Sequence, residues 1–164
     1  MDRRGRKILI CGLPGSGKTT LAKTLADMLG AFWFDGDAVR QLSANWGFDH
    51  AARIKQAHNM SSLCDQVIAA GYTAIASFVC PTRYTRAEFN ADFTIFCDRI
   101  VACPYPDTNA LWVEPSDADY TVTPEGSVDY HAGRILLALD KAAEKMSTIR
   151  LCHELQGGQD DTGC

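Results

Sequence analysis

The sequence predicts an α/β fold, a doubly wound parallel sheet of about five strands with helices on both faces. Two observations support it: short apolar runs alternate with helical patterns, and the first run leads directly into a glycine-rich turn. A chain of 164 residues with 46% hydrophobic composition can bury one compact core. We expect a single domain over residues 1–149 and a disordered tail over 150–164, where the composition becomes polar and glycine-bearing.

The first strand and the first helix enclose a phosphate-binding turn. The sequence pattern predicts a buried strand at residues 8–10 and a helix at residues 20–29. The turn between them fits G-x-x-x-x-G-K-[ST]. Glycines let such a turn aim backbone N–H groups at phosphates, and the helix adds the positive end of its dipole. This P-loop, or Walker A, motif predicts the P-loop NTPase type of fold. The residues expected to bind ATP are Gly12, Leu13, Pro14, Gly15, Ser16, Gly17, Lys18, Thr19 and Thr20.

The second apolar run leads into two carboxylates, Asp35 and Asp37. Open parallel sheets bind ligands at the carboxyl ends of their strands, so we expect these acids beside the P-loop. Lys18, Asp35 and Asp37 would be catalytic, because the lysine would reach the β- and γ-phosphates and an acid would take a proton from an attacking hydroxyl. Thr19 and Asp35 would hold Mg²⁺. The alternative is that one of the acids only caps the helix that follows.

The rest of the chain continues the alternation of strands and helices. Strands are expected at 72–79, 93–97 and 120–122, and helices at 38–44, from 49 or 50 to 70 with Gly71 as its C-cap, at 82–90 and at 127–146. The apolar positions of the long helix are expected to pack in the core: Ile54, Met60, Leu63, Val67 and Ile68. Residues 98–109 contain two prolines and no sustained periodicity, which predicts a loop near the site or a small lid.

Charge and cysteine content narrow the functional classes. A formal net charge of -4 argues against a protein held to nucleic acid by an overall basic field, although it leaves room for a local cationic cleft. The chain has seven cysteines without a C-x-x-C pair and starts without the pattern of a signal peptide, which predicts free thiols and a cytoplasmic location. The four scattered histidines argue against a zinc site, and no apolar run is long enough for a membrane span.

Four segments in order carry a resemblance to a known family. GLPGSGKTTLA, FDGDAVR, NWGFDHAAR and ASFVCPTR, within residues 8–90, resemble the motifs of the adenylylsulfate (APS) kinases. The resemblance implies MgATP as phosphate donor and a hydroxyl as acceptor, with Asp35 as general base or magnesium-linked acid and Asp37 beside it. It also implies that Arg40 and Arg53 contact the acceptor's anionic group and that Phe48 stacks on its base. The simpler alternatives are that Arg40 only pairs with Asp37 and that Phe48 belongs to the core.

The departures from this family lie on the acceptor side. Cys80 stands where the APS kinases have serine, and Gln56 stands where they have asparagine. Their basic lid and GFTGID-like segment are replaced by DRIVACPYPDTN, with Arg99 as its only basic residue. A shortened lid would leave the acceptor side open, which suits a large substrate.

With this open acceptor side, the chain also resembles a second group, the phage P-loop kinases that phosphorylate 5-hydroxymethyluracil in DNA. This similarity rests on the DGDxVR core, the short lid and the DTN segment at residues 107–109. It implies that a flipped base stacks on Phe48, and that DNA phosphates are held by arginines such as Arg40, Arg53, Arg83 or Arg99.

Three functions follow from these patterns. The first hypothesis is an ATP-dependent kinase for 5-hydroxymethyl-deoxyuridine in phage DNA, a step in thymidine hypermodification in the host cytoplasm. The alternative is an APS kinase, and a third possibility is a regulatory module that binds or hydrolyses ATP. The substrate-binding residues expected for either kinase are Arg40, Phe48, Arg53 and Arg83. We expect no membrane partner, and the sequence does not predict the oligomeric state.

Overall fold

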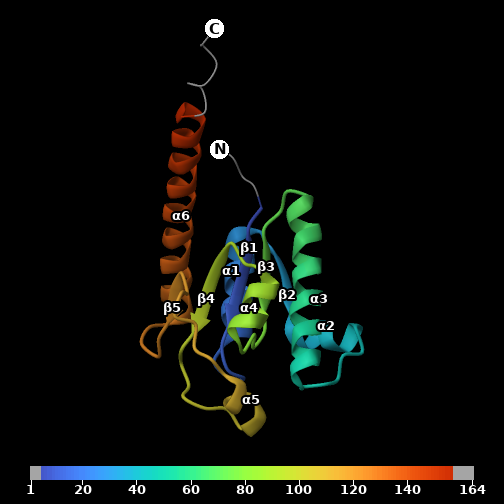
Figure 1. The fold of residues 1–164 in the computed structure, drawn as a ribbon. Coiled ribbons are helices and arrows are strands. Elements are labelled where there is room, and N and C mark those ends of the chain that lie inside the picture. The colour runs from blue at the N-terminus through green and yellow to red at the C-terminus, as the bar shows by residue number, and fades with distance from the viewer. Residues whose placement is uncertain (1–4, 157–164) are drawn as a thin grey trace.

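The computed structural model describes residues 5–156, in which five parallel strands form one sheet with the order β2-β3-β1-β4-β5 (Figure 1). The strands are β1 (Lys7–Cys11), β2 (Phe32–Asp35), β3 (Ala74–Ser77), β4 (Phe93–Cys97) and β5 (Tyr120–Val122). The helices are α1 (Lys18–Leu29), α2 (Gly36–Leu42), α3 (His50–Ala69), α4 (Arg83–Phe89), α5 (Pro106–Leu111) and α6 (Val128–Gln156). The predicted fold class is confirmed.

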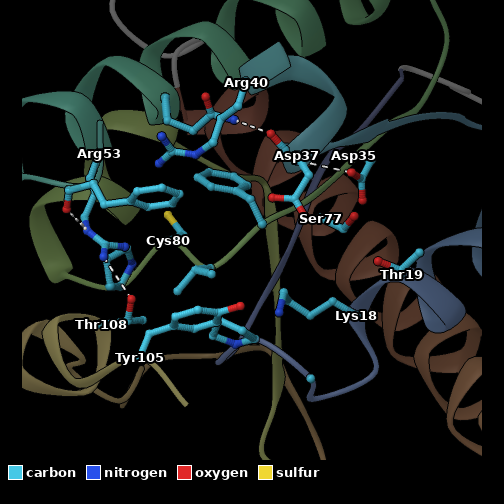
Figure 2. A pocket seen from close by; sticks show the side chains of 18 of the residues that line it. Lys18, Thr19, Asp35, Asp37, Arg40, Arg53, Ser77, Cys80, Tyr105 and Thr108 are labelled. Atoms are coloured by element: carbon cyan, nitrogen blue, oxygen red, sulfur yellow. Dashed lines mark hydrogen bonds between the residues drawn. The ribbon is translucent and has the colours of Figure 1, made fainter. Parts of the chain in front are cut away.

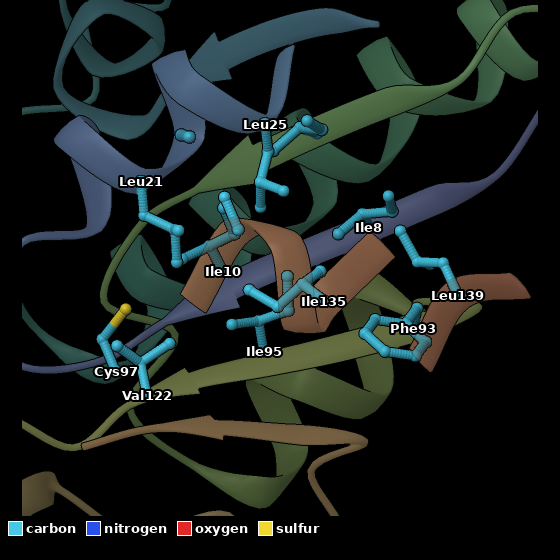
Figure 3. Close-up of a cluster of buried hydrophobic side chains, with 13 residues drawn as sticks. Ile8, Ile10, Leu21, Leu25, Phe93, Ile95, Cys97, Val122, Ile135 and Leu139 are labelled. Carbon is cyan, nitrogen blue, oxygen red and sulfur yellow. The ribbon is translucent and has the colours of Figure 1, made fainter. Parts of the chain in front are cut away.

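Alternation along the central strand β1 divides the core into two layers. Ile8 and Ile10 lie in one cluster, whose large helical side chains are Leu21 and Leu25 of α1 and Ile135 and Leu139 of α6 (Figure 3). Leu9 and Cys11 point to the opposite face, where Met60 and Cys64 of α3 and Phe89 of α4 cover the sheet. Both faces of the sheet are therefore buried, as a parallel sheet requires, and its carboxyl edge is left for ligands.

Helix α3 is positioned by its caps, but its buried face differs from the prediction. Asp49 caps its first turn by accepting a hydrogen bond from the Ala52 N–H at 2.8 Å. The C-cap is Ala70, and the predicted Gly71 follows it with φ +87°, a conformation that favours glycine. Ile54, expected in the core, is only half-buried, because the first turns of α3 bury polar side chains against the carboxyl edge instead.

The C-terminal half differs from the sequence prediction in two places. Helix α5 begins inside the stretch expected to be a loop or a lid. Helix α6 continues past its expected end, so that residues 150–156 of the predicted tail are helical. The remainder of that tail, 157–164, lies outside the described residues.

Two other predictions concern the whole part of the chain that the structure describes. Its cysteines are free thiols, and five of the six are buried, whereas Cys164 lies outside the described range. Within 5–156, no helix combines the length and apolar character needed to cross a membrane.

Candidate functional site

A cavity of about 410 Å³ lies at the carboxyl edge of the sheet. Its walls are the P-loop, the junction of β2 and α2, the start of α3, the residues after β3, and α5. Figure 2 shows Lys18 and Thr19 toward one end, and Arg53 and Thr108 toward the other. The cavity brings together most of the residues singled out from the sequence: Pro14, Gly15, Lys18, Thr19, Asp35, Asp37, Arg40, Phe48 and Arg53.

The P-loop takes a backbone path that requires glycine at two positions. At Gly12, an added Cβ would lie 2.8 Å from the carbonyl oxygen of Cys97, so a side chain cannot fit against β4. At Gly17, which precedes α1, φ is +91°, in the left-handed region. These glycines let the turn wrap closely around the start of α1, where backbone N–H groups are free to face an anion.

Lys18 lies folded against its own loop. Its Nζ donates a hydrogen bond to the Leu13 carbonyl at 2.8 Å. Burial lowers the pKa of the Lys18 ammonium, while the thiols of Cys97 and Cys11 and the carboxylates of Asp37 and Asp35 raise it in part. The ammonium would have to leave the Leu13 carbonyl to reach a phosphate in the cavity.

Asp35 has the capping role that the sequence left open. Its Oδ1 accepts hydrogen bonds from the N–H groups of Asp37 and Ala38 at 3.0 and 3.2 Å, which caps α2. The turn lies against β3, because a Cβ on Gly36 would approach the Cβ of Phe78 to 2.5 Å. Both cap bonds use Oδ1, so the carboxylate is held in place while Oδ2 can face a ligand. Asp37 is exposed and lines the same cavity.

The two residues predicted to hold magnesium suit an ion that takes its other ligands from a nucleotide and water. The Thr19 hydroxyl and the Asp35 carboxylate line the same cavity. Over residues 5–156, no group of three or more His, Cys, Asp or Glu side chains is placed to hold a metal. Mg²⁺ commonly takes only one or two protein oxygens and completes its shell with phosphate oxygens and water. This donor set agrees with that pattern.

The two arginines at the other end of the cavity hold the loop before α3. Nη1 of Arg40 donates to the carbonyls of Asn45 and Gly47 at 3.1 and 2.7 Å. Nε of Arg53 donates to the Phe48 carbonyl at 2.7 Å. Both guanidinium groups also lie over the Phe48 ring, with centroid distances of 4.8 and 5.8 Å. These contacts fix a loop that would otherwise have little structure of its own.

The electrostatics of this end are set by two cations that lie close together. Burial and the charge of Arg53 lower the pKa of Arg40, and Asp37 opposes this shift. Arg40 does not only pair with Asp37, because its guanidinium donates to two backbone carbonyls, whereas Asp37 acts on it through its charge. Phe48 is 58% exposed, so it is not a core residue.

Arg53 connects α3 to α5. The residue is 5% exposed, and its Nη2 donates to the Thr108 hydroxyl at 2.9 Å and approaches the Asp107 carboxylate to 3.4 Å. Tyr105, Asp107 and Thr108 therefore line the cavity, although none was predicted as a site residue. The sequence did place residues 98–109 near the site, as a loop or a small lid, and Pro106 at the first position of α5 was a further signal, because proline favours the start of a helix.

Three further residues line the cavity although they were not predicted as site residues, and one predicted substrate-binding residue lies outside it. Gln56 is 2% exposed and donates from Nε2 to the Gly36 carbonyl at 2.8 Å. Ser77 accepts a hydrogen bond from Trp33 Nε1 at 2.9 Å. Cys80 is buried at φ +47°, and burial raises the pKa of its thiol. Arg83, expected to bind substrate, is exposed at the start of α4 and is not among the residues that line the cavity.

Comparison with known families agrees with the motif order. The family model described as adenylylsulphate kinase matches residues 4–109. An adenylyl-sulfate kinase of Synechococcus sp. (strain JA-3-3Ab) is 34% identical over 110 residues, which cover 63% of this chain and 62% of that protein. One from Chloroflexus aurantiacus is 35% identical over 92 residues, 52% of this chain and 50% of that protein. The chain thus matches only half to under two thirds of the length of these relatives.

Solved structures share the fold. The Mycobacterium tuberculosis APS kinase in complex with AMPPNP and APS aligns with a TM-score of 0.73 at 23% identity, over 84% of this chain and 98% of that one. A hexameric APS kinase from Thiobacillus denitrificans aligns with a TM-score of 0.66 at 27% identity, over 85% of this chain and 30% of that one. A gluconokinase from Sinorhizobium meliloti reaches a TM-score of 0.66 at 15% identity, over 90% of this chain and 98% of that one, which shows a common fold only.

Proposed function

Because this chain belongs to the adenylylsulphate kinase family, we propose that it is an ATP-dependent kinase that phosphorylates a hydroxyl of adenylylsulfate. The observation that carries the proposal is a single cavity lined by a P-loop, the Asp35 carboxylate and an arginine-rich end with an exposed aromatic ring. Adenylylsulfate replaces the modified DNA base as the preferred acceptor, because the curated relatives described above are adenylyl-sulfate kinases.

In the proposed reaction, the acceptor hydroxyl attacks the γ-phosphorus of ATP. A bond forms between that oxygen and phosphorus, the bond from phosphorus to the β,γ-bridging oxygen breaks, and ADP leaves with its electron pair. Asp35 orients the hydroxyl or takes its proton on Oδ2, because Oδ1 is engaged in capping α2. Lys18 moves from the Leu13 carbonyl to the phosphates, where it and the P-loop N–H groups balance the developing charge.

Thr19, together with Asp35 where that carboxylate is the magnesium-linked acid and not the base, would hold a magnesium ion, which would supply positive charge against the phosphates. At the other end, Arg40 and Arg53 face the acceptor's anionic group and Phe48 offers its exposed ring to the adenine. Each of these roles is a proposal that follows from the positions of the side chains in one cavity.

The test is phosphate transfer from labelled ATP to adenylylsulfate. We expect labelled product with the wild-type protein and at least about a 100-fold loss of transfer in Asp35→Asn. Asparagine retains the Oδ1 that caps α2, so the variant should keep its thermal stability. Asp117→Asn, at an exposed position outside the cavity, is the control for loss of one charge. Full activity in a folded Asp35→Asn protein would remove the proposed base.

One observation favours a second acceptor, 5-hydroxymethyluracil in DNA. Large aromatic rings are exposed at the acceptor end, the end of the cavity lined by Arg40 and Arg53, and such rings can stack on the bases of an opened strand. Phe48 (58% exposed) and Tyr105 (56%) line the cavity, and Trp46 (65%) and Tyr84 (57%) are exposed outside its lining. The same labelled ATP should be offered with single-stranded DNA that contains 5-hydroxymethyluracil. Label in that DNA but not in adenylylsulfate would favour this acceptor, whereas ATP hydrolysis without transfer to either would favour a regulatory ATPase.

A further inference from the structure

Helix α5 is anchored as a wall of the cavity. Asn109 closes the preceding loop, because its Oδ1 accepts from the Cys103 N–H at 2.9 Å and its Nδ2 donates to the Cys103 carbonyl at 2.8 Å. After the helix, the Trp112 ring lies 5.8 Å from that of Phe96, and the Val113 N–H donates to the Pro81 carbonyl at 2.8 Å. Both ends of this short segment are therefore fixed to the body of the domain.

Helix α5 contacts Arg53 through two side chains, one buried and uncharged and the other exposed and charged. The Thr108 hydroxyl is buried and accepts from Nη2 at 2.9 Å, so it holds the guanidinium group in place. The Asp107 carboxylate lies 3.4 Å from the same nitrogen, and its side chain is 61% exposed. At that distance and exposure the ion pair adds little stability. The negative charge nevertheless lies in the lining of the cavity, beside Arg53.

Charges at the acceptor end are balanced before any ligand binds. The two cations are Arg40 and Arg53, and each has a carboxylate nearby: Asp37 acts on Arg40, and Asp107 approaches Arg53. An acceptor with several negative charges would gain attraction from the guanidinium groups but would also be repelled by Asp107. Two unit charges 4 Å apart in water interact by roughly 1 kcal/mol, which corresponds to about a fivefold change in affinity.

We propose that Asp107 is a specificity-determining residue that disfavours highly anionic acceptors, and that Thr108 is a positioning residue that holds Arg53 toward the acceptor. The proposal rests on the kinase function proposed above and refines the acceptor that the site selects. It predicts opposite effects from two neighbouring residues. Removing the charge of Asp107 strengthens the binding of an anionic acceptor, whereas removing the hydroxyl of Thr108 weakens it.

The test is the affinity of adenylylsulfate, measured by calorimetry with AMPPNP and Mg²⁺ present, for the full chain and three variants. Asp107→Asn keeps the shape of the side chain and should tighten binding about 3- to 10-fold, with a smaller gain at high salt. Thr108→Val keeps the shape but leaves a buried N–H unpaired, and should weaken binding about 10-fold or more. Asp117→Asn removes one exposed charge outside the cavity and should leave the affinity unchanged.

The sign of the Asp107→Asn effect separates selectivity from structural support. If Asp107 only helped to hold α5 against Arg53, the variant would bind more weakly, and that result would overturn the proposal. Equal affinities, or no binding of adenylylsulfate to either protein, would overturn it as well. Failure of the kinase proposal alone gives a different result: adenylylsulfate would bind with the predicted order of affinities but would receive no phosphate from ATP.

Discussion

The two ends of the cavity are built in different ways. The P-loop end comes from one continuous segment, whose shape is set by glycines at positions where a side chain cannot fit. The acceptor end is assembled from the loop before α3, from α3 itself and from α5, and Arg53 joins these parts through hydrogen bonds to Phe48 and Thr108. A local backbone motif thus defines one end, and long-range side-chain contacts define the other.

This difference leads to different expectations for substitutions. At the P-loop end, a single side chain should affect catalysis and leave the structure in place, since glycine geometry and backbone bonds shape the loop. At the acceptor end, each arginine both holds the loop before α3 and lines the cavity, so substitutions should change acceptor binding and local structure together.

The largest effect is expected from Lys18→Ala. Lys18 is the P-loop cation that lines the cavity, and its loss should lower kcat for transfer to adenylylsulfate by about 100- to 1,000-fold or more. Its only hydrogen bond given by the described structure goes to the Leu13 carbonyl, so the thermal unfolding temperature should change little. A variant that retains kcat would contradict the catalytic role of Lys18. A variant that unfolds would show that the Lys18 side chain is needed for stability as well.

A smaller and more selective effect is expected from Arg53→Lys. A single ammonium cannot reproduce the contacts that the guanidinium makes with Phe48, Thr108 and Asp107. The KM for adenylylsulfate should rise about 10- to 100-fold, while the KM for ATP stays nearly constant. Steady-state kinetics with each substrate varied separately would measure this division.

The matched control for that variant is Arg83→Lys. Arg83 is exposed on α4 outside the cavity, so neither KM should change with adenylylsulfate as acceptor. An equal rise of both KM values in Arg53→Lys would remove the distinction between the two ends. A rise in the acceptor KM of the control would restore Arg83 as a substrate-binding residue.

The sequence predicted the parts of the molecule that depend on local patterns better than the parts that depend on long-range contacts. The strands, the order of elements and the P-loop depend on local patterns, and the predicted bounds of β4 and β5 agree with the structure. The contact between Arg53 and Thr108 joins residues 55 positions apart, and no local pattern indicates it. Periodicity also assigned Ile54 to the core, although the sheet edge makes Arg53 and Gln56 the buried residues of that turn. The prediction therefore weakened where polar side chains are buried by tertiary contacts.

The smallest expected effect is on the pH dependence of stability, and it arises from Cys97, which packs against Gly12 of the P-loop. Burial raises the pKa of the Cys97 thiol from its ordinary value of 9.0 to about 11, although Lys18 and Arg99 oppose the shift. The folded state thus keeps a proton that the unfolded state loses above pH 9. The free energy of unfolding should therefore fall between pH 9 and about 11, by up to roughly 1.4 kcal/mol per pH unit for this thiol.

Cys97→Ala should reduce that slope, although the variant is less stable at neutral pH because it leaves a small void. Urea unfolding at several pH values from 8 to 11 would measure the free energy of unfolding and its slope with pH. Cys152→Ala, at an exposed position on α6, should keep the wild-type slope. Parallel curves for wild type and Cys97→Ala would mean that the thiol is not protected beneath the loop. Because no acceptor takes part, the measurement tests the packing of the P-loop end independently of the reaction proposed for the cavity.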